Sequence, residues 1–307
     1  MRAAAITAFG GPEVLTVTDV DDPPVAPDTV LIRVRAAGVN PVDHLVATGA
    51  LASMFPTRFP LVPGWDVAGV VERVGPAVPE WAPGDEVVAY ARRDDVQWGT
   101  YAELVPAPVR SVARKPSSVG FAEAAGLPLA GLTALQCLER AEVGAGDVVL
   151  VHAAAGGVGQ MAVQIAVARG ARVVGTASER NHEHLRSLGA EPVVYGEGLA
   201  ERVRALAPGG VDAALDLVGG EAVAVSAQLV DRPGRIVSVI DPAAVAEVGG
   251  RYVFVRPDAA QLAELAGMVD AGTLRVDVAA TFPLERAADA WRLSREGHVR
   301  GKVVVTV

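Results

Sequence analysis

The stretch Ala153-Ala154-Ala155-Gly156-Gly157-Val158-Gly159 decides the fold class of this chain of 307 residues. An apolar run typical of a buried strand, residues 147–152, precedes it. Residues 158–169 follow with the spacing of a helix, and residues 172–176 form a second strand-like run. A glycine turn between a strand and a helix, with another strand after the helix, predicts an α/β fold with a doubly wound parallel sheet.

The small residues of this turn follow a variant of the fingerprint that binds dinucleotides. Ala153, Gly156 and Gly159 allow the backbone to approach a pyrophosphate and the helix to pack close to the strand. The first N–H groups of the helix and its dipole favour an anion at this place. We therefore predict cofactor contacts at the tip of the turn, from Ala155, Gly156, Gly157 and Val158. The alternative is a tight turn that holds no ligand.

The end of the next strand selects the cofactor. An NAD site has Asp or Glu there to bond the ribose hydroxyls, whereas this chain continues from residue 176 as Thr-Ala-Ser-Glu-Arg-Asn. Ser178 can hydrogen-bond a 2′-phosphate, and Arg180 can bind it as a charged fork. The pattern favours NADPH over NADH, and the alternative is that Arg180 lies on a solvated helix start.

The remaining chain divides into a β-rich part and an alternating part. Up to residue 116, short strand-like runs separated by Pro and Gly turns predict a small barrel or sandwich. From residue 117, helices alternate with strands whose continuous Val, Ile and Leu content suits a sheet covered on both faces. We expect one domain of residues 117–255, inserted into a second domain of residues 1–116 and 256–307. The expected strands include 30–36, 65–74, 86–90, 192–195, 211–217, 235–240 and 302–307, and the expected helices include 121–127, 132–141, 183–188, 258–271 and 284–294.

Composition and charge exclude several classes of function. The formal charge is −9 and no basic cluster occurs, which argues against a nucleic-acid binder. The single cysteine, Cys137, excludes an intrachain disulfide and a Cys-rich zinc lobe. The apolar stretch 148–168 is interrupted by glycines and polar residues, and the N-terminus lacks the apolar core of a signal peptide. We expect a cytoplasmic protein without a membrane partner. Because Lys115 and Lys302 are the only lysines, we interpret the excess of Arg as a compositional bias.

A series of motifs runs along nearly the whole chain. They are Gly38-Val39-Asn40-Pro41-Val42-Asp43, Pro63-Gly64-Trp65-Asp66-Val67-Ala68-Gly69-Val70-Val71, Gly84-Asp85-Glu86-Val87, Gly99-Thr100-Tyr101-Ala102-Glu103, Leu127-Pro128-Leu129-Ala130-Gly131-Leu132-Thr133-Ala134, His152 to Gly159, Asp216-Leu217-Val218-Gly219-Gly220 and Gly301-Lys302-Val303-Val304. In this order they resemble the medium-chain dehydrogenase/reductase superfamily, specifically its zinc-free quinone oxidoreductase branch of zeta-crystallin-like proteins.

The resemblance implies a fold, an activity and an assembly. The fold is a GroES-like substrate domain plus a Rossmann domain. The activity is NADPH-dependent reduction of quinones, or of alkenes activated by a neighbouring carbonyl. The assembly is a homodimer or homotetramer, with a homodimer preferred, whose subunits pair near residues 251–255. Two alternatives stay open: a reductase of enoyl thioesters or biosynthetic intermediates, and a crystallin-like NADP-binding protein without turnover.

The resemblance also adds residues that line the cofactor. Val218, Ile240, Phe254 and Val255 match family positions of this kind, although each is equally compatible with the core. Thr133 is a candidate contact to the nicotinamide or, alternatively, a helix N-cap. Tyr195 can close over the adenosine phosphate or, alternatively, is an aromatic residue at a strand end.

Candidate catalytic residues cluster in Asn40-Pro41-Val42-Asp43-His44-Leu45. Without a metal, hydride transfer needs orientation and a donor for the developing oxyanion. Asn40 can donate an N–H to the substrate oxygen or position the nicotinamide ribose, Asp43 can hold a ribose hydroxyl, and His44 can relay a proton. The alternative is that Asn40 and Asp43 shape a loop and His44 is exposed. Leu45 replaces the Tyr or Lys of many relatives and cannot donate a proton, so the proton donor stays open.

The residue types argue against a metal and for an apolar substrate. Catalytic zinc needs three ligands from Cys, His or acids. This chain has Asn40 where zinc-dependent relatives have their first Cys, and Trp65-Asp66 where they have His-Glu. His182 and His184 are two residues apart and do not share a helix face. We expect no metal site. Apolar residues in loops 48–58 and 92–98 predict a pocket for a small apolar or aromatic carbonyl compound.

Overall fold

The computed structural model describes residues 1–297 and 299–307, which form two compact units. The first unit contains residues 1–132, 257–272 and 276–307, and the second contains residues 133–256 and 273–275. The expected boundary between residues 116 and 117 differs from this division. Residues 117–132 stay with the first unit because α2 (Phe121–Ala125) contacts β3 (Thr29–Val39) and β5 (Asp66–Val74). Residues 273–275 join the second unit because the side-chain amide of Gln164 bonds both the carbonyl and the N–H of Arg275.

A parallel six-stranded sheet forms the centre of the second unit. Its order, β12-β11-β10-β13-β14-β15, reads 3-2-1-4-5-6 in chain order, which is the doubly wound Rossmann arrangement. The α/β fold class predicted from the glycine turn is thus confirmed. The strand order reverses between β10 and β13, where such sheets bind ligands at the carboxyl ends of their strands. The strands are β10 (Val148–Val151), β11 (Arg172–Thr176), β12 (Ala190–Val193), β13 (Ala213–Asp216), β14 (Ile236–Ser238) and β15 (Arg251–Tyr252).

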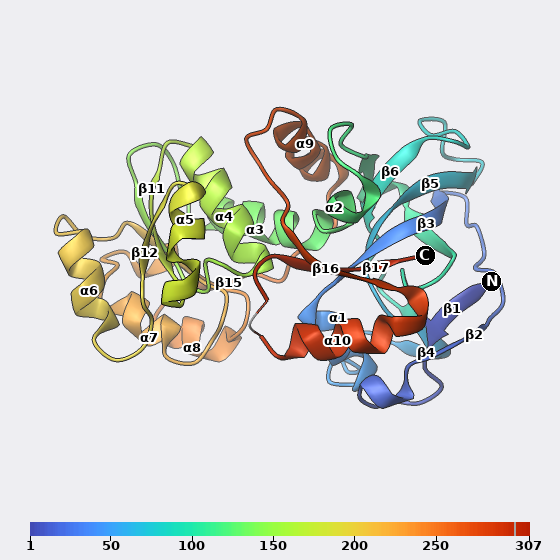
Figure 1. Cartoon of the computed structure of the whole chain (residues 1–307), viewed down its shortest axis with the longest axis horizontal. Helices are drawn as coiled ribbons and strands as arrows, with labels where there is room; N and C mark the ends of the chain where they lie inside the picture. Colours follow the sequence, from blue (N-terminus) through green and yellow to red (C-terminus); the bar gives the residue numbers. More distant parts are fainter. Residues whose placement is uncertain (298) are drawn as a thin grey trace. The chain divides into compact units, whose positions relative to one another are not determined.

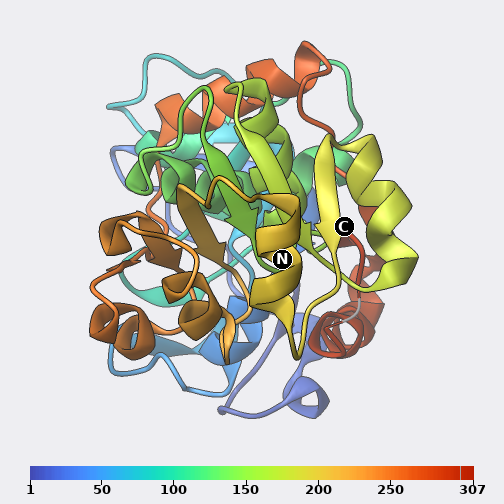
Figure 2. The same ribbon diagram turned by 90° about the vertical axis from the view of Figure 1, so that its left-hand side faces the viewer.

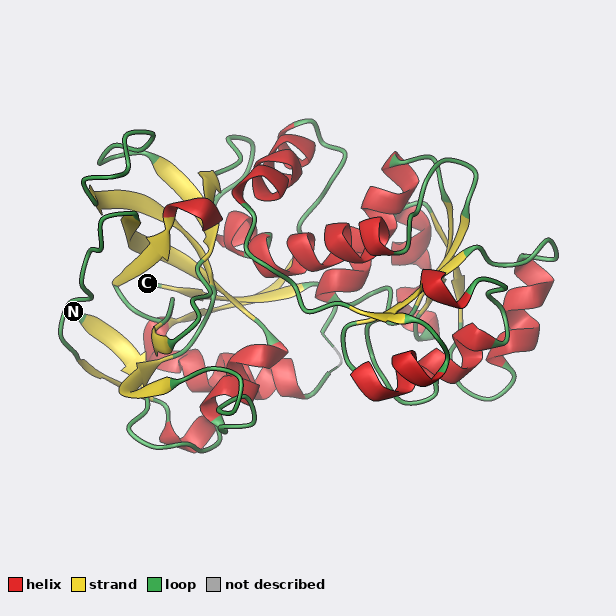
Figure 3. Cartoon of the chain, turned by 180° about the vertical axis from the view of Figure 1, so that it is seen from behind, coloured by secondary structure: helices red, strands yellow, loops and turns green. Residues whose placement is uncertain are grey.

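Helices cover both faces of this sheet (Figures 2 and 3). On one face, Leu150, Val174 and Ile236 lie in a buried cluster with apolar residues of α6, α7 and α8. Residue 175 faces the other side of the sheet, because side chains alternate along a strand. A Cβ atom on Gly175 would lie 3.3 Å from Cδ1 of Leu185 in α5. The helices are α3 (Pro128–Arg140), which begins in the first unit, α4 (Gly157–Ala168), α5 (His182–Ser187), α6 (Leu199–Leu206), α7 (Ala222–Ala227) and α8 (Pro242–Glu247), with the 3₁₀ turns η3 (Glu179–Asn181) and η4 (Pro233–Arg235).

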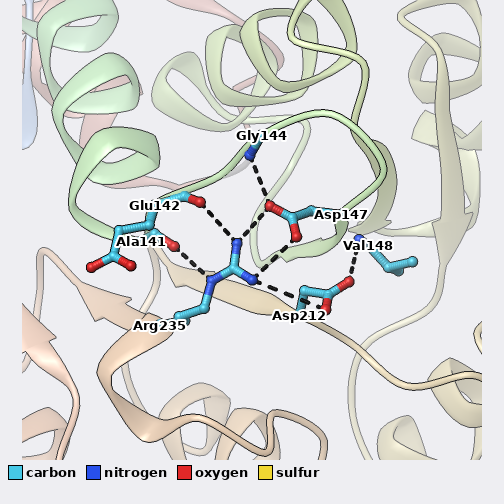
Figure 4. Close-up of polar contacts among 7 residues, drawn as sticks. All are labelled: Ala141, Glu142, Gly144, Asp147, Val148, Asp212 and Arg235. Carbon is cyan, nitrogen blue, oxygen red and sulfur yellow. Dashed lines mark hydrogen bonds and ion pairs between the residues drawn. The ribbon is translucent and has the colours of Figure 1, made fainter.

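Arg235 ties together the amino-terminal edge of the sheet (Figure 4). Its buried guanidinium donates to both carboxylate oxygens of Asp147, at 3.1 and 2.6 Å, and to the carbonyl oxygens of Ala141 and Glu142. Asp147 also accepts the N–H of Gly144, and its hydrogen bonds with Arg235 hold its pKa below the usual range. Because Asp147 precedes β10 and the glycine turn follows it, this network fixes the sheet from the end opposite the turn.

The main sheet of the first unit collects strands from both ends of the chain. Its order is β16-β17-β3-β5-β6-β9, and β8 pairs with β3 beside this path. The last strand, β17, lies antiparallel to β3 and places Val304 opposite Gly38. Figure 1 draws these two paired strands in red and blue. The end of the chain therefore completes the β-rich unit. The further strands are β6 (Glu86–Tyr90), β8 (Leu104–Pro108), β9 (Val112–Arg114), β16 (Val278–Pro283) and β17 (Lys302–Thr306).

Smaller elements complete the described part of the first unit. Two-stranded sheets form from β1 (Arg2–Ala5) with β2 (Thr16–Asp19) and from β4 (Thr57–Val62) with β7 (Val96–Trp98). The helices besides α2 are α1 (Pro41–Ala47), α9 (Ala259–Asp270) and α10 (Ala287–Arg295), with the 3₁₀ turns η1 (Pro12–Val14), η2 (Val109–Ser111) and η5 (Leu284–Arg286). Within residues 1–297 and 299–307, no helix combines the length and the apolar character that crossing a membrane requires.

Several element boundaries differ from the sequence predictions. β6 and β11 occupy the expected residues 86–90 and 172–176. α3 begins at Pro128, a residue type favoured at the first helical position, so Thr133 lies inside the helix and is not its N-cap. β12 ends at Val193, so Tyr195 follows the strand instead of ending it. Residues 41–47 form a helix where one alternative expected a loop.

Candidate cofactor-binding and active-site residues

The glycine turn leads from β10 into α4, as the sequence predicts. Ala153 has a φ of +50°, which residues with a Cβ atom rarely adopt, and Gly156 is the N-cap of α4. A Cβ atom on Gly159 would lie 2.3 Å from the carbonyl oxygen of Ala153 and 2.7 Å from Cα of Ala154. Only glycine at position 159 therefore allows α4 to start this close to the end of β10.

Hydrogen bonds from neighbouring elements fix the shape of the turn. The side chain and the carbonyl of Thr176, at the end of β11, accept the N–H groups of Ala153 and Ala154 at 3.0 and 2.9 Å. The buried amide of Gln160 donates to the carbonyl of Ala155 at 2.9 Å. The first N–H groups of α4 have no acceptor within the helix and are half-buried or buried at residues 157–159. Their direction and the helix dipole suit a pyrophosphate.

The end of β11 carries the residues expected to select the cofactor. Ser178 is half-buried and directly precedes η3. Its Oγ accepts a hydrogen bond from the side-chain nitrogen Nδ2 of Asn181 at 3.4 Å. Arg180 is exposed on the same turn, as is Glu179. The two predicted phosphate-binding residues thus lie two positions apart on one short turn beside the glycine turn, since β11 pairs with β10.

Three apolar side chains stand exposed at the carboxyl-terminal edge of the sheet. Tyr195 follows β12, Val218 follows β13 and Ile240 follows β14, and they are 57%, 57% and 52% exposed. All three were predicted to line the cofactor. Sheets with this strand order bind their ligands at this edge.

The other predicted cofactor contacts in this unit are less accessible. Thr133 is buried within α3, Val255 is buried beyond β15, and Phe254 is half-buried beside it. Cofactor contacts from Thr133, Phe254 and Val255 stay predictions.

His152 is a buried residue of the turn, and no role was predicted for it. Its Nε2 lies 3.0 Å from Oγ of Ser226, whose hydroxyl donates to the carbonyl of Ala222. Because the hydroxyl proton is used there, Nε2 donates to Ser226. Burial lowers the pKa of His152 to about 4, so the imidazole that bonds Ser226 beside the turn is neutral.

Asn40 lies at the centre of a buried polar network in the first unit. Its Nδ2 donates to Oδ2 of Asp66 at 2.9 Å, and its Oδ1 accepts a hydrogen bond from Nζ of Lys302. Lys302 also donates to the carbonyl of Val39 and lies 3.7 Å from Oδ2 of Asp66. Oδ1 of Asp66 accepts the N–H of Leu129 at 2.7 Å. The Asn40 amide thus joins the start of α1 to β5 and β17.

Asp43 continues this network on the first turn of α1. Its Oδ2 accepts the N–H of Asn40 and the hydroxyl of Tyr101, both at 2.8 Å, while its Oδ1 has no partner among the described residues. Tyr101 in turn accepts the indole N–H of Trp291 at 3.2 Å. Burial raises the pKa of Asp43 to about 7, which makes this carboxyl a group that can hold a proton near neutral pH.

His44 lies on the same helix but outside the Asn40 network. It is half-buried, with its ring at 77° and 6.2 Å from the ring of Trp291, and its Nδ1 has no hydrogen-bond partner among the described residues. Burial lowers its pKa, and the positive charge of Arg295 adds to this effect. Both effects favour the neutral imidazole. Leu45, next along the helix, is exposed.

Lys302, Tyr101 and Trp291 belong to this site, although none of the three was predicted to do so. All three are buried, and they come from β17, from the segment after β7 and from α10. One signal was available, because a lysine in an otherwise apolar strand needs a buried partner for its charge.

Two family models match the chain. The model of the alcohol dehydrogenase GroES-like domain matches residues 26–117, and a zinc-binding dehydrogenase model matches residues 188–305. The β-rich first unit and the parallel sheet of the second thus correspond to the expected pair of GroES-like and Rossmann domains.

The zinc that the second model's description implies does not fit these residues. Both polar atoms of the Asn40 side chain are engaged by Asp66 and Lys302, and the Lys302 ammonium stands beside Asp66. A zinc ion there would face a buried cation and an amide ligand. Across residues 1–297 and 299–307, no group of three or more His, Cys, Asp or Glu side chains is arranged to hold a metal ion.

Relatives resemble the chain over its full length. The chloroplastic NADPH-dependent alkenal/one oxidoreductase of Arabidopsis thaliana is 37% identical over 314 residues, which cover 99% of this chain and 79% of that protein. The structure of a quinone oxidoreductase from Coxiella burnetii has a TM-score of 0.88 at 35% identity and covers 100% of this chain and 99% of its own. The structure of an NAD-dependent alcohol dehydrogenase has a TM-score of 0.89 at 35% identity, with 100% of both chains covered. From these matches and the two-unit fold, we conclude that the chain belongs to the medium-chain dehydrogenase/reductase superfamily, in its quinone oxidoreductase branch.

Proposed function

We propose that this protein is an NADPH-dependent oxidoreductase that transfers a hydride to a quinone or to an alkene activated by a neighbouring carbonyl. The observation that carries the proposal is the glycine turn at the strand-order reversal, where Gly159 allows α4 to begin directly behind the end of β10. The names of the alkenal/one and quinone oxidoreductase relatives support the same class of reaction.

The second unit supplies the groups that would hold NADPH. The N–H groups at the start of α4 suit the pyrophosphate, and Ser178 with Arg180 suits the 2′-phosphate. The exposed Tyr195 offers a cover for the adenosine phosphate, and Val218 and Ile240 offer an apolar surface to the nicotinamide. When bound, NADPH supplies the hydride and its two electrons.

The substrate also needs a proton, and the first unit constrains its source. Reduction of an activated alkene adds the hydride to the carbon distant from the carbonyl and a proton to the adjacent carbon. Leu45 cannot supply that proton. His44 stays our candidate to relay it from solvent, while Asn40 and Asp43, tied to Asp66 and Tyr101, position the start of α1. The substrate, on this proposal, is a small apolar or aromatic carbonyl compound. A cytoplasmic homodimer stays a prediction.

Oxidation of NADPH in the presence of candidate acceptors tests the function directly. We expect the absorbance of NADPH to fall with 1,2-naphthoquinone and with small alkenals and enones, and to stay constant without an acceptor. Product analysis for the saturated carbonyl distinguishes alkene reduction from quinone reduction. Binding of NADPH without oxidation across the whole panel would favour a nucleotide-binding protein without turnover and would contradict the proposal.

The choice of NADPH over NADH has its own test in Arg180→Ala. Loss of one charged hydrogen-bonding group to the 2′-phosphate is expected to weaken NADPH binding about 10- to 100-fold, while NADH, which lacks this phosphate, binds almost unchanged. Titration calorimetry with both nucleotides measures the difference. Arg186→Ala, on the following helix α5, is a control of equal charge change with no expected effect on either nucleotide. Equal losses for NADPH and NADH in Arg180→Ala would rule out the phosphate contact.

A further inference from the structure

Two loops at the carboxyl-terminal edge of the parallel sheet present apolar side chains next to each other. Val218 lies in the loop after β13, and Ile240 lies in the loop after β14. The loops touch, since a Cβ atom on Gly219 would lie 2.9 Å from Cγ2 of Ile240. β13 also neighbours β10, so this apolar pair stands beside the glycine turn. Two buried residues, Asp216 and Ser238, hold these exposed loops in one arrangement.

Asp216 holds the loop that carries Val218 through hydrogen bonds to its backbone. It is the last residue of β13, is fully buried, and pairs in register with Ser238 of β14. Its Oδ1 accepts the N–H groups of Val218 and Gly219 at 3.0 and 2.7 Å. Its Oδ2 accepts the hydroxyl of Ser238 at 2.6 Å. Hydrogen bonds to a carboxylate are roughly twice as strong as neutral ones, so the loop that carries Val218 is held firmly.

Ser238 fixes the second loop in the same way. Its Oγ accepts the N–H groups of Ile240 and Asp241 at 3.1 and 3.0 Å while its proton goes to Asp216. A hydroxyl has one donor and two acceptor positions, and the protein itself uses all three. Ser238 is also fully buried, so it has neither the exposure nor a free position to contact a ligand. Its hydrogen bonds serve the backbone of the loop that carries Ile240.

We infer that Asp216 and Ser238 are positioning residues that hold Val218 and Ile240 as one apolar platform for the nicotinamide half of the cofactor. This inference rests on the proposed function, because the platform orients a nicotinamide ring. The carboxylate–hydroxyl bond joins the two loops across adjacent strands, so the ring meets the same surface in every molecule. Hydride transfer depends on such orientation.

Ser238→Ala tests the inference with two ligands. The variant leaves Oδ2 of Asp216 and the N–H groups of Ile240 and Asp241 without the Ser238 hydroxyl, so the platform loosens. We expect the Kd for NADPH to rise about 10-fold and kcat to fall by a similar factor. The Kd for 2′,5′-ADP, which lacks the nicotinamide half, is expected to stay within about twofold of the wild type, because its contacts lie at the start of α4 and the end of β11.

Two further variants separate this role from general destabilisation. Ile240→Ser changes an exposed side chain and removes part of the platform itself, so it should reproduce the selective loss of NADPH affinity without unfolding the unit. Ser111→Ala removes another buried serine hydroxyl, which donates only to the carbonyl of Pro108, and should leave both affinities unchanged.

The outcomes distinguish the inference from the proposed function. A selective loss for NADPH in Ser238→Ala and in Ile240→Ser supports the platform. Equal losses for NADPH and 2′,5′-ADP, or no loss for either, would overturn the inference while the wild type still binds NADPH. Failure of the wild-type protein to bind NADPH would overturn the proposed function itself, and the platform with it.

Discussion

Gly159→Ala is expected to weaken NADPH binding about 100-fold, because it moves the start of α4 away from the pyrophosphate. The new Cβ atom would lie 2.3 Å from the carbonyl oxygen of Ala153 and within 2.8 Å of two backbone atoms of Ala154. Backbone atoms cannot rotate away as a side chain does, so the helix and the turn must separate. A shift of this kind forfeits about two charge-assisted hydrogen bonds to the phosphates. Titration calorimetry of the variant with NADPH measures the loss.

The same substitution should also destabilise the second unit. Overpacking in a tight contact costs typically 1–3 kcal/mol, and the buried surroundings of Gly159 leave little room for relaxation. Gly267→Ala is the matched control, because Gly267 lies inside α9 and a Cβ atom there would meet nothing within 4 Å. That control is expected to gain roughly 0.5–1 kcal/mol of stability and to bind NADPH normally. An alanine at position 159 that binds NADPH as tightly as glycine does would mean that the turn holds no pyrophosphate.

The glycine turn was predictable because its causes are local. The small residues, the strand before them and the helix after them all lie within residues 147–169, and each signal depends only on neighbours in the sequence. Ser178 and Arg180 were predicted as cofactor contacts for the same reason, since they follow the next strand directly. The predicted start of α3 at residue 132 was wrong, because the helix begins at Pro128, a residue type favoured at the first helical position, and not after a cap at Thr133.

The polar network around Asn40 was only half predictable, because its parts are far apart in the sequence. Asn40 and Asp43 belong to a local motif, and the sequence indicated them. Their partners Tyr101, Trp291 and Lys302 reach them only through the pairing of β17 with β3 and the packing of α10 on α1. No local pattern carries that pairing. The loops that carry Val218 and Ile240 are a second example. They are joined by the hydrogen bond from Ser238 to Asp216, which lie on separate strands.

Lys302→Met is expected to destabilise the first unit by about 3–5 kcal/mol, because it leaves the buried charge of Asp66 without its counter-ion. Burial raises the pKa of Asp66 and lowers that of Lys302, and the attraction between the two charges opposes both shifts. Without the ammonium, Asn40 and Val39 also lose the donor to their oxygens. All four tryptophans lie at positions 65, 81, 98 and 291 of the first unit, so chemical unfolding followed by tryptophan fluorescence reports on this unit alone.

Two comparisons decide whether the buried charge is the cause of this loss. Lys115→Met changes the only other lysine, which is also buried but pairs with the exposed Glu86 and bonds two backbone carbonyls, so its cost should stay near 1–2 kcal/mol. Asp66→Asn added to Lys302→Met removes the orphaned charge, and should restore at least half of the lost stability, because replacing both members of a buried pair is far milder than removing one. A double variant no more stable than Lys302→Met would show that Lys302 acts through packing, and that Asp66 is not the group whose charge it neutralises.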